Sequence, residues 1–140
     1  MTSSIEVSAF GMQAARKRVE IASSNLANME VTNAGDGKPY KAKQLRVAAI
    51  DLPGTFSSAL EKATLKAPVV TQVLESDAVR REYQPGHPDA DAQGFVAYPD
   101  INMISTMTDL MSATRVYQAN VAAIDSAKTI KKAANEILTA

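Results

Sequence analysis

The chain has 140 residues, which favours one domain with appended elements. Its 15 basic and 15 acidic side chains cancel, so no field of one sign is available to hold nucleic acid or an anionic membrane surface. Cysteine is absent, which excludes disulfides, thiolate metal ligands and cysteine nucleophiles, and the aromatic content of 5% favours thin helical seams over a dense core.

Residues 3–28 are predicted to form an amphipathic helix. Large apolar side chains recur every seven residues and small side chains follow three positions later, which is the a/d pattern of a coiled coil. The large positions are Ile5, Met12, Val19 and Leu26, and the small positions are Ser8, Ala15 and Ala22. Gly11 lies in mid-helix at a cost of about 1 kcal/mol, so we expect either a kink or a tightly packed neighbour there. Asn25 and Asn28 in the last turn favour a helix end, since Asn tolerates the left-handed conformation.

Residues 29–99 are predicted to form a connector and a small β-rich domain. The connector, residues 29–39, is rich in Gly, Asn, Asp and Pro, which are turn residues. In residues 40–99, Val and Tyr enrichment with Pro and Gly punctuation predicts short strands. The candidate strands are Tyr40–Ile50, Val69–Leu74, Arg80–Tyr83 and Phe95–Tyr98. Residues 55–64 fit either a short helix or a loop.

Residues 101–140 contain neither Gly nor Pro, and their apolar residues return at steps of three and four, which predicts one long amphipathic helix. Asp100 or Asn102 can serve as its N-cap. The stripe consists of Met103, Met107, Leu110, Tyr117, Val121 and Ile124, with Thr114 in one slot. Such a helix is about 60 Å long, whereas a domain of this size is about 30–35 Å across. The stripe therefore needs a partner beyond the chain's own core. Methionines on one face fit either an ordinary core or an adaptable partner surface.

The predicted fold class is α+β. We expect the long terminal helices to pair as an antiparallel coiled-coil-like hairpin, with the small β-rich insert between them. Residues 1–28 and 100–140 then form a terminal helical (axial core) domain, and residues 29–99 form the connector and the β-rich domain. No membrane span is predicted, because no stretch approaches ~18 apolar residues. The N-terminus lacks the apolar core of a cleavable signal peptide, so we expect a cytosolic chain or one exported by a route that does not use such a signal.

No catalytic, cofactor or metal site is predicted. His87 is the only histidine, and it lies near Asp89 and Asp91. A zinc site needs three or four ligands with several His or Cys, and a calcium loop of the EF type needs alternating oxygen ligands and a terminal Glu. Neither pattern is present. We interpret His87 as a structural residue of a Pro-rich loop, in preference to a metal ligand or a catalytic base.

Several segments resemble bacterial flagellar rod and hook proteins. Residues 24–28, Ser-Asn-Leu-Ala-Asn, resemble the shared motif that ends their N-terminal helix, and residues 111–121 resemble their C-terminal helical motif. Residues 83–91, Tyr-Gln-Pro-Gly-His-Pro-Asp-Ala-Asp, with Gly-Phe-Val at 94–96, are more discriminating. Together with residues 36–44 they are similar to the C-subunit branch of the proximal-rod proteins, within the flagellar basal-body rod protein family. The resemblance covers nearly the whole chain.

The resemblance implies a structural protein, not an enzyme, in the periplasmic part of the flagellar basal body. Such proteins are exported through the flagellar type III apparatus without a cleavable signal peptide. The terminal helices are expected to polymerise into a helical tube that transmits motor torque and surrounds the export channel. Expected partners are copies of the chain and other rod proteins. Further candidates are the export apparatus and the basal-body ring proteins.

The expected subunit interface combines the two stripes with the motif residues. It consists of Ile5, Met12, Val19, Asn25, Leu26, Asn28, Met103, Met107, Leu110, Met111, Arg115, Tyr117, Asn120, Val121 and Ile124. A soluble helical adaptor or export-chaperone-like binding module is the alternative, since it would use the same amphipathic helices. A chaperone forms a discrete complex, whereas a rod subunit forms a helical array by heterologous contacts.

Overall fold

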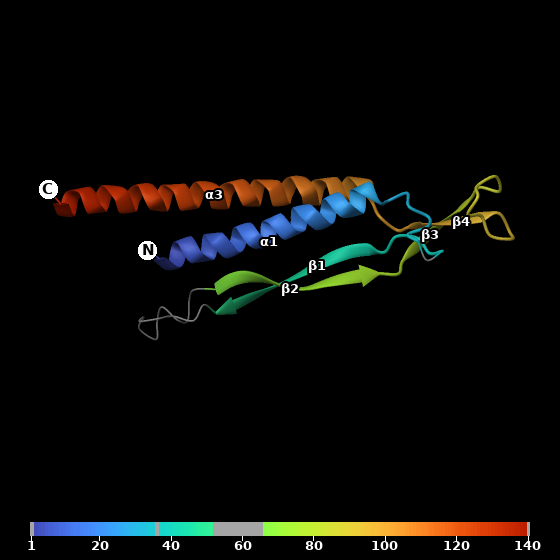
Figure 1. Ribbon diagram of the computed structural model, residues 1–140, viewed down its shortest axis with the longest axis horizontal. Coiled ribbons are helices and arrows are strands. Elements are labelled where there is room, and N and C mark those ends of the chain that lie inside the picture. Colours follow the sequence, from blue (N-terminus) through green and yellow to red (C-terminus); the bar gives the residue numbers. More distant parts are fainter. Residues whose placement is uncertain (1, 36, 52–65, 140) are drawn as a thin grey trace.

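The computed structural model describes residues 2–35, 37–51 and 66–139 (Figure 1). Along these ranges of the chain, one helix precedes and one helix follows two β-hairpins. The elements are α1 (Thr2–Ala27), β1 (Ala42–Asp51), β2 (Lys66–Ser76), β3 (Val79–Tyr83), β4 (Phe95–Pro99) and α3 (Met103–Thr139). The α+β class is confirmed, with an N-terminal helix, a small antiparallel β insert and a C-terminal helix. The prediction for residues 55–64 lies outside the described residues.

The four candidate strands all form, but they make two separate two-stranded sheets within the described residues. β1 pairs antiparallel with β2 from Ala42↔Ser76 to Asp51↔Lys66, with an irregularity between Arg46 and Val47. β3 pairs antiparallel with β4 from Val79↔Pro99 to Tyr83↔Phe95. Isolated two-stranded sheets are marginally stable in water. β1 and β2 both contact α1, which supplies the support that the hairpin lacks.

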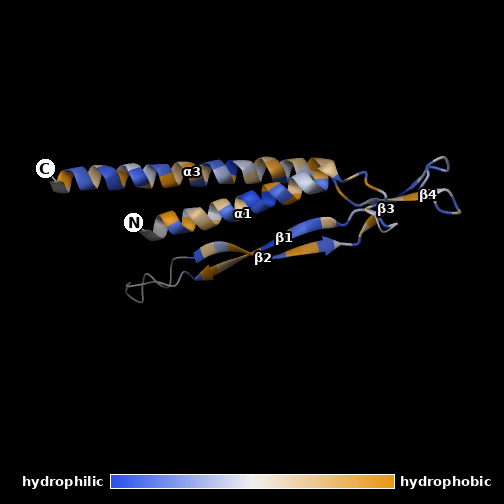
Figure 2. Ribbon diagram, in the orientation of Figure 1, coloured by the Kyte–Doolittle hydropathy of each residue, from blue (hydrophilic) through white to orange (hydrophobic). Residues whose placement is uncertain are grey.

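The terminal helices lie side by side and run in opposite directions, and α1 lies between α3 and the β1–β2 hairpin (Figure 1). With 37 residues α3 is about 55 Å long, whereas α1 with 26 residues is about 39 Å long. The C-terminal end of α3 therefore extends past the start of α1. Figure 2 shows that hydrophobic residues continue along this extension. None of the helices in the described ranges is long and apolar enough to span a membrane.

Local signals explain the ends of the helices. Of the two candidate N-caps of α3, Asn102 takes that role: its Oδ1 accepts the backbone N–H of Ser105 at 3.0 Å. At the end of α1, Asn28 Nδ2 donates to the carbonyl of Ser24 at 2.7 Å, which satisfies one of the last carbonyls of the helix. In the connector, Gly35 and Gly37 adopt φ of 111° and 75°, a conformation that glycine adopts without steric cost.

The core is thin and rich in alanine. The buried apolar residues are Ala14, Ala15, Ile21, Ala22, Ala42, Ala67, Val96, Tyr98 and Ala113. Alanine buries little apolar area, so burial of these side chains contributes little free energy by itself. The alanines stabilise the fold mainly because they let the helices and strands approach each other closely. The small core leaves many large apolar side chains partly exposed, above all on α3.

Candidate assembly interface

α1 and α3 approach each other closely at Gly11. A Cβ at this position would lie 2.8 Å from Oδ1 and 2.9 Å from Nδ2 of Asn120 on α3. The Asn120 amide is held by its own helix, since Nδ2 donates to the carbonyl of Val116 at 2.9 Å. Gly11 thus has the tightly packed neighbour that its position in mid-helix suggested. Ala15 and Ala113, each 2% exposed, fit the same close seam.

The large members of the α1 stripe are not the most buried ones. Ile5, Met12, Val19 and Leu26 are all half-buried. The small members Ala15 and Ala22 are only 2% and 6% exposed. Within this stripe, Ala15 and Ala22 therefore face neighbours in the same chain, and the four large residues lie at the margin of the contact. Outside the stripe, Ile21 is buried as well.

The α3 stripe is less covered still. Leu110, Val121 and Ile124 are half-buried. Met103, Met107 and Tyr117 keep 43%, 44% and 37% of their surface exposed. Arg115 is also exposed, as its place on the helix surface allows.

A group of exposed apolar residues lies at the N-terminal end of α3, and we call it the α3 outer patch. Its members are Met103, Ile104, Met107 and Met111. Ile104 is 78% exposed and Met111 58% exposed. Sequence analysis missed Ile104, although its steps of three to Met107 and four from there to Met111 carry the helical signal. Contiguous exposed apolar side chains on a soluble protein indicate a surface that contacts another molecule.

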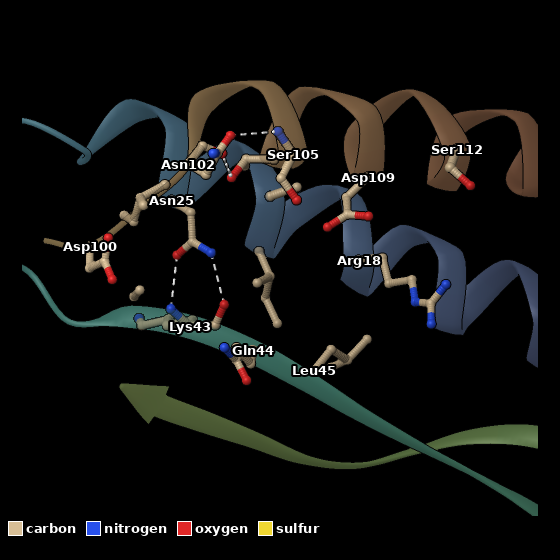
Figure 3. Close-up of a pocket in the computed structure, with 15 residues that line it drawn as sticks. Arg18, Asn25, Lys43, Gln44, Leu45, Asp100, Asn102, Ser105, Asp109 and Ser112 are labelled. Carbon is tan, nitrogen blue, oxygen red and sulfur yellow. Dashed lines mark hydrogen bonds between the residues drawn. The ribbon is translucent and has the colours of Figure 1, made fainter. Parts of the chain in front are cut away.

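The Asn residues of the 24–28 motif act within the chain. Asn25 Nδ2 donates to the carbonyl of Lys43 at 2.8 Å, and the N–H of Lys43 donates to Asn25 Oδ1 at 2.9 Å (Figure 3). Tyr40 OH also donates to Asn25 Oδ1, at 3.2 Å. The motif therefore joins the end of α1 to the start of β1, a contact that sequence analysis did not foresee.

An open cleft of about 460 Å³ lies beside this junction, between α1, β1 and the start of α3. Figure 3 shows Arg18 and Asn25 from α1 on one wall, Lys43 and Gln44 on β1, and Asp109 on α3. The cleft mixes both signs of charge with amide groups. It lacks the cluster of hydrogen-bond donors that would bind a phosphate and the cluster of ligand atoms that would bind a metal.

The loop that contains His87 is held together by its own polar groups. The backbone N–H of Asp89 donates to His87 Nδ1 at 3.1 Å, and Thr32 Oγ1 donates to Asp89 Oδ2 at 2.7 Å. Asp91 Oδ1 accepts the N–H groups of Phe95 and Gln93, which lowers the pKa of its carboxyl group. These bonds give all three side chains a structural role. No cluster of three metal-ligating side chains occurs in the part of the chain that the structure describes.

Comparison with known families agrees with this arrangement. The model described as flagella basal body rod protein matches residues 5–34, which hold most of α1 and the start of the connector. The model described as flagellar basal body rod FlgEFG protein C-terminal matches residues 92–137, which hold β4 and most of α3. The chain belongs to the flagellar basal-body rod protein family, as the resemblance predicted.

Within that family, the proteins to which the chain is similar include the FlgC proteins. The flagellar basal-body rod protein FlgC of Salmonella typhimurium is 34% identical over 126 residues, which cover 89% of this chain and 88% of the relative. FlgC of Bacillus subtilis is 35% identical over 145 residues, covering 96% and 95%. FlgC of Borreliella burgdorferi is 32% identical over 146 residues, covering 97% and 96%. The similarity therefore includes the β insert as well as the terminal helices.

Proposed function

We propose that the chain is a structural subunit of the proximal part of the flagellar rod and that it polymerises through its terminal helices. The polymer is a helical tube that transmits motor torque and surrounds the export channel. The observation that carries this proposal is the α3 outer patch, which stays exposed after α1 and α3 have packed on each other. Each large apolar side chain that a neighbour covers fully contributes about 1.5–3 kcal/mol.

The terminal helices are proposed to form an antiparallel coiled-coil-like hairpin that acts as the axial core domain, comprising residues 1–28 and 100–140. The small side chains at Gly11, Ala15 and Ala113 support close pairing of the two helices. Residues 29–99 are proposed to be the connector and the β-rich domain. The half-buried and exposed members of the two stripes then serve as the contacts to neighbouring subunits.

The proposed partners are copies of the chain and other rod proteins, with the export apparatus and basal-body ring proteins as further contacts. The proposed location is the periplasmic part of the basal body, reached by flagellar export without a cleavable signal peptide. The protein acts by assembly rather than by catalysis. The bonds around His87 and Asp91 are consistent with this, since they use both side chains to shape a loop.

The proposal is tested by placing a charge on the α3 outer patch. Ile104→Asp and Met111→Asp should leave the isolated protein folded, because both side chains are exposed within the chain. Each should block assembly, since a neighbour would have to bury an unpaired carboxylate. Ser126→Asp, at another exposed position of α3, is the matched control and should assemble.

The assay expresses each variant in a flagellated bacterium that lacks its own copy of the subunit. Rods are counted by electron microscopy of isolated basal bodies, and swimming is scored in soft agar. Normal rods with both patch variants would show that the patch is not an interface. Circular dichroism of the purified variants checks that their helices are intact.

A further inference from the structure

The side chain of Asn25 pairs with β1 as a neighbouring strand would. Its Nδ2 donates to the carbonyl of Lys43 and its Oδ1 accepts the N–H of the same residue, at 2.8 and 2.9 Å. In an antiparallel pair, the N–H and C=O of one residue point together either toward the partner strand or away from it. Lys43 lies opposite Glu75 of β2 but directs both groups to Asn25. The amide thus satisfies one position on the open edge of β1.

Two hydroxyl groups extend this pairing. Tyr40 OH donates to Asn25 Oδ1 at 3.2 Å, and the hydroxyls of Ser24 and Tyr40 share a hydrogen bond of 3.0 Å. All of these bonds are partly buried, where a hydrogen bond is stronger than in water. The last turn of α1 is therefore bonded to the chain at two points, one just before β1 and one inside it.

Apolar packing at the same place combines Ile21 with small side chains. The buried residues where α1 meets β1 include Ala22 and Ala42. The hydrophobic effect is non-directional, so burial of small side chains sets the position of β1 less sharply than a hydrogen bond does. A slip of one residue along β1 would present Asn25 with the backbone groups that point to β2. The paired bonds to Lys43 therefore favour one register of the hairpin on α1.

The rest of the insert depends on that register. β2 ends at Ser76 and β3 begins at Val79, so the second hairpin is joined by a very short link. The N–H of Asp100 then donates to the carbonyl of Ala78 at 3.1 Å, which ties the exit of β4 to the same link. A change in the register of β1 on α1 would therefore also displace β3 and β4.

We propose that Asn25 is a positioning residue for assembly, which fixes the orientation of the β insert relative to the terminal helices so that every subunit presents its insert alike. The prediction that Asn25 belongs to the subunit interface stays a prediction, and the present proposal gives the residue a role within one chain. It rests on the proposed function only for its effect on assembly. The hydrogen bonds between Asn25 on α1 and Lys43 on β1, which we call the lock, are contacts within one chain.

The lock is tested in the purified protein with Asn25→Ala and Asn25→Asp. The Asp variant keeps an acceptor for the N–H of Lys43 and places a second oxygen against its carbonyl. Asn28→Ala is the matched control, because it removes a bond at the same helix end without touching β1. The chain has no cysteine, so spin labels can be attached at Ser23→Cys on α1 and Gln72→Cys on β2.

Both Asn25 variants are expected to broaden the distribution of distances between the two labels, whereas Asn28→Ala leaves it unchanged. Exchange of the Lys43 amide hydrogen should become roughly tenfold faster in Asn25→Ala, because its acceptor is lost. If Asn25→Ala does not fold, Tyr40→Phe, which removes one bond to Oδ1, should broaden the same distribution to a smaller extent. An unchanged distribution in the folded variants overturns the lock.

The effect on assembly is measured in the same strain and by the same rod count as above. Asn25→Asp should yield roughly tenfold fewer rods, while its helical content by circular dichroism matches the control Asn28→Ala. Normal rods from a variant with a loosened junction would refute the positioning role and leave the proposed function intact. Normal rods from Ile104→Asp and Met111→Asp would instead refute the interface on α3.

Discussion

Gly11→Ala tests the close contact between α1 and α3. The new Cβ would lie 2.8 Å from Oδ1 of Asn120, roughly 0.7 Å short of the closest favourable non-bonded separation. Asn120 can withdraw only by giving up its bond to the Val116 carbonyl, at about 0.5–1.5 kcal/mol. Any residual overlap pushes the helices apart, and overpacking costs about 1–3 kcal/mol. Against this, alanine gains about 1 kcal/mol over glycine in a helix interior.

Gly11→Ala alone is therefore expected to lower the free energy of unfolding by between zero and about 2 kcal/mol. In an Asn120→Ala background the obstacle is gone, so the same substitution should stabilise by about 1 kcal/mol. Denaturant unfolding of the four proteins, followed by circular dichroism, gives the coupling between the two positions. Equal stabilisation by Gly11→Ala in both backgrounds would refute the inference that Asn120 occupies the space above Gly11.

Two further predictions concern Asp91 and the end of α3. Backbone hydrogen bonds from Phe95 and Gln93 lower the pKa of Asp91, so the stabilisation they give is present above the ordinary value of about 3.9 and is lost as pH falls through the lower folded pKa. Hydrogen exchange of the Gln93 and Phe95 amides, corrected for its intrinsic pH dependence, should therefore become faster as the pH falls through this range. Asp91→Ala should abolish the pH dependence. A corrected exchange rate that does not change with pH in the unmodified protein would contradict the prediction. On α3, Ile130 and Ile137 are 57% and 78% exposed, so residues 130–137 should exchange fast in the isolated protein and slowly in rods. Equal protection in both states would show that this end is stable without neighbours.

Residue periodicity predicted the helices and strands because each depends on local spacing. The steps of three and four on α3 and the Val-rich runs of the insert are independent of what lies beside them. The cap at Asn102 was likewise readable, since it joins residues only three positions apart. Boundaries differ by a few residues, as for β2, which begins at Lys66 rather than at Val69.

Periodicity could not show which side of α1 is covered. A heptad pattern shows which residues share a face, but α1 has neighbours on two sides, α3 and the β1–β2 hairpin. The contact with Asn120 therefore centres on Gly11, and Met12 and Val19 are left half-buried. The bonds from Asn25 to Lys43 span 18 positions along the chain, and no local rule links an amide in a helix end to the edge of a later strand.

The length of α3 beyond α1 bears on the order of events when a rod grows. Ile130 and Ile137 near this end are exposed within the chain, and short helical segments without tertiary packing are marginal in water. In a rod built as proposed, the last turns of α3 therefore gain packing from a neighbouring subunit. Each addition combines joining with the completion of folding, and the ordering of these turns reduces the net affinity of the contact. In a free subunit, the surface that binds the next subunit is then incomplete, because the last turns of α3 are not yet ordered. Growth is favoured at an existing end, where helices are already held in place, over spontaneous nucleation in solution.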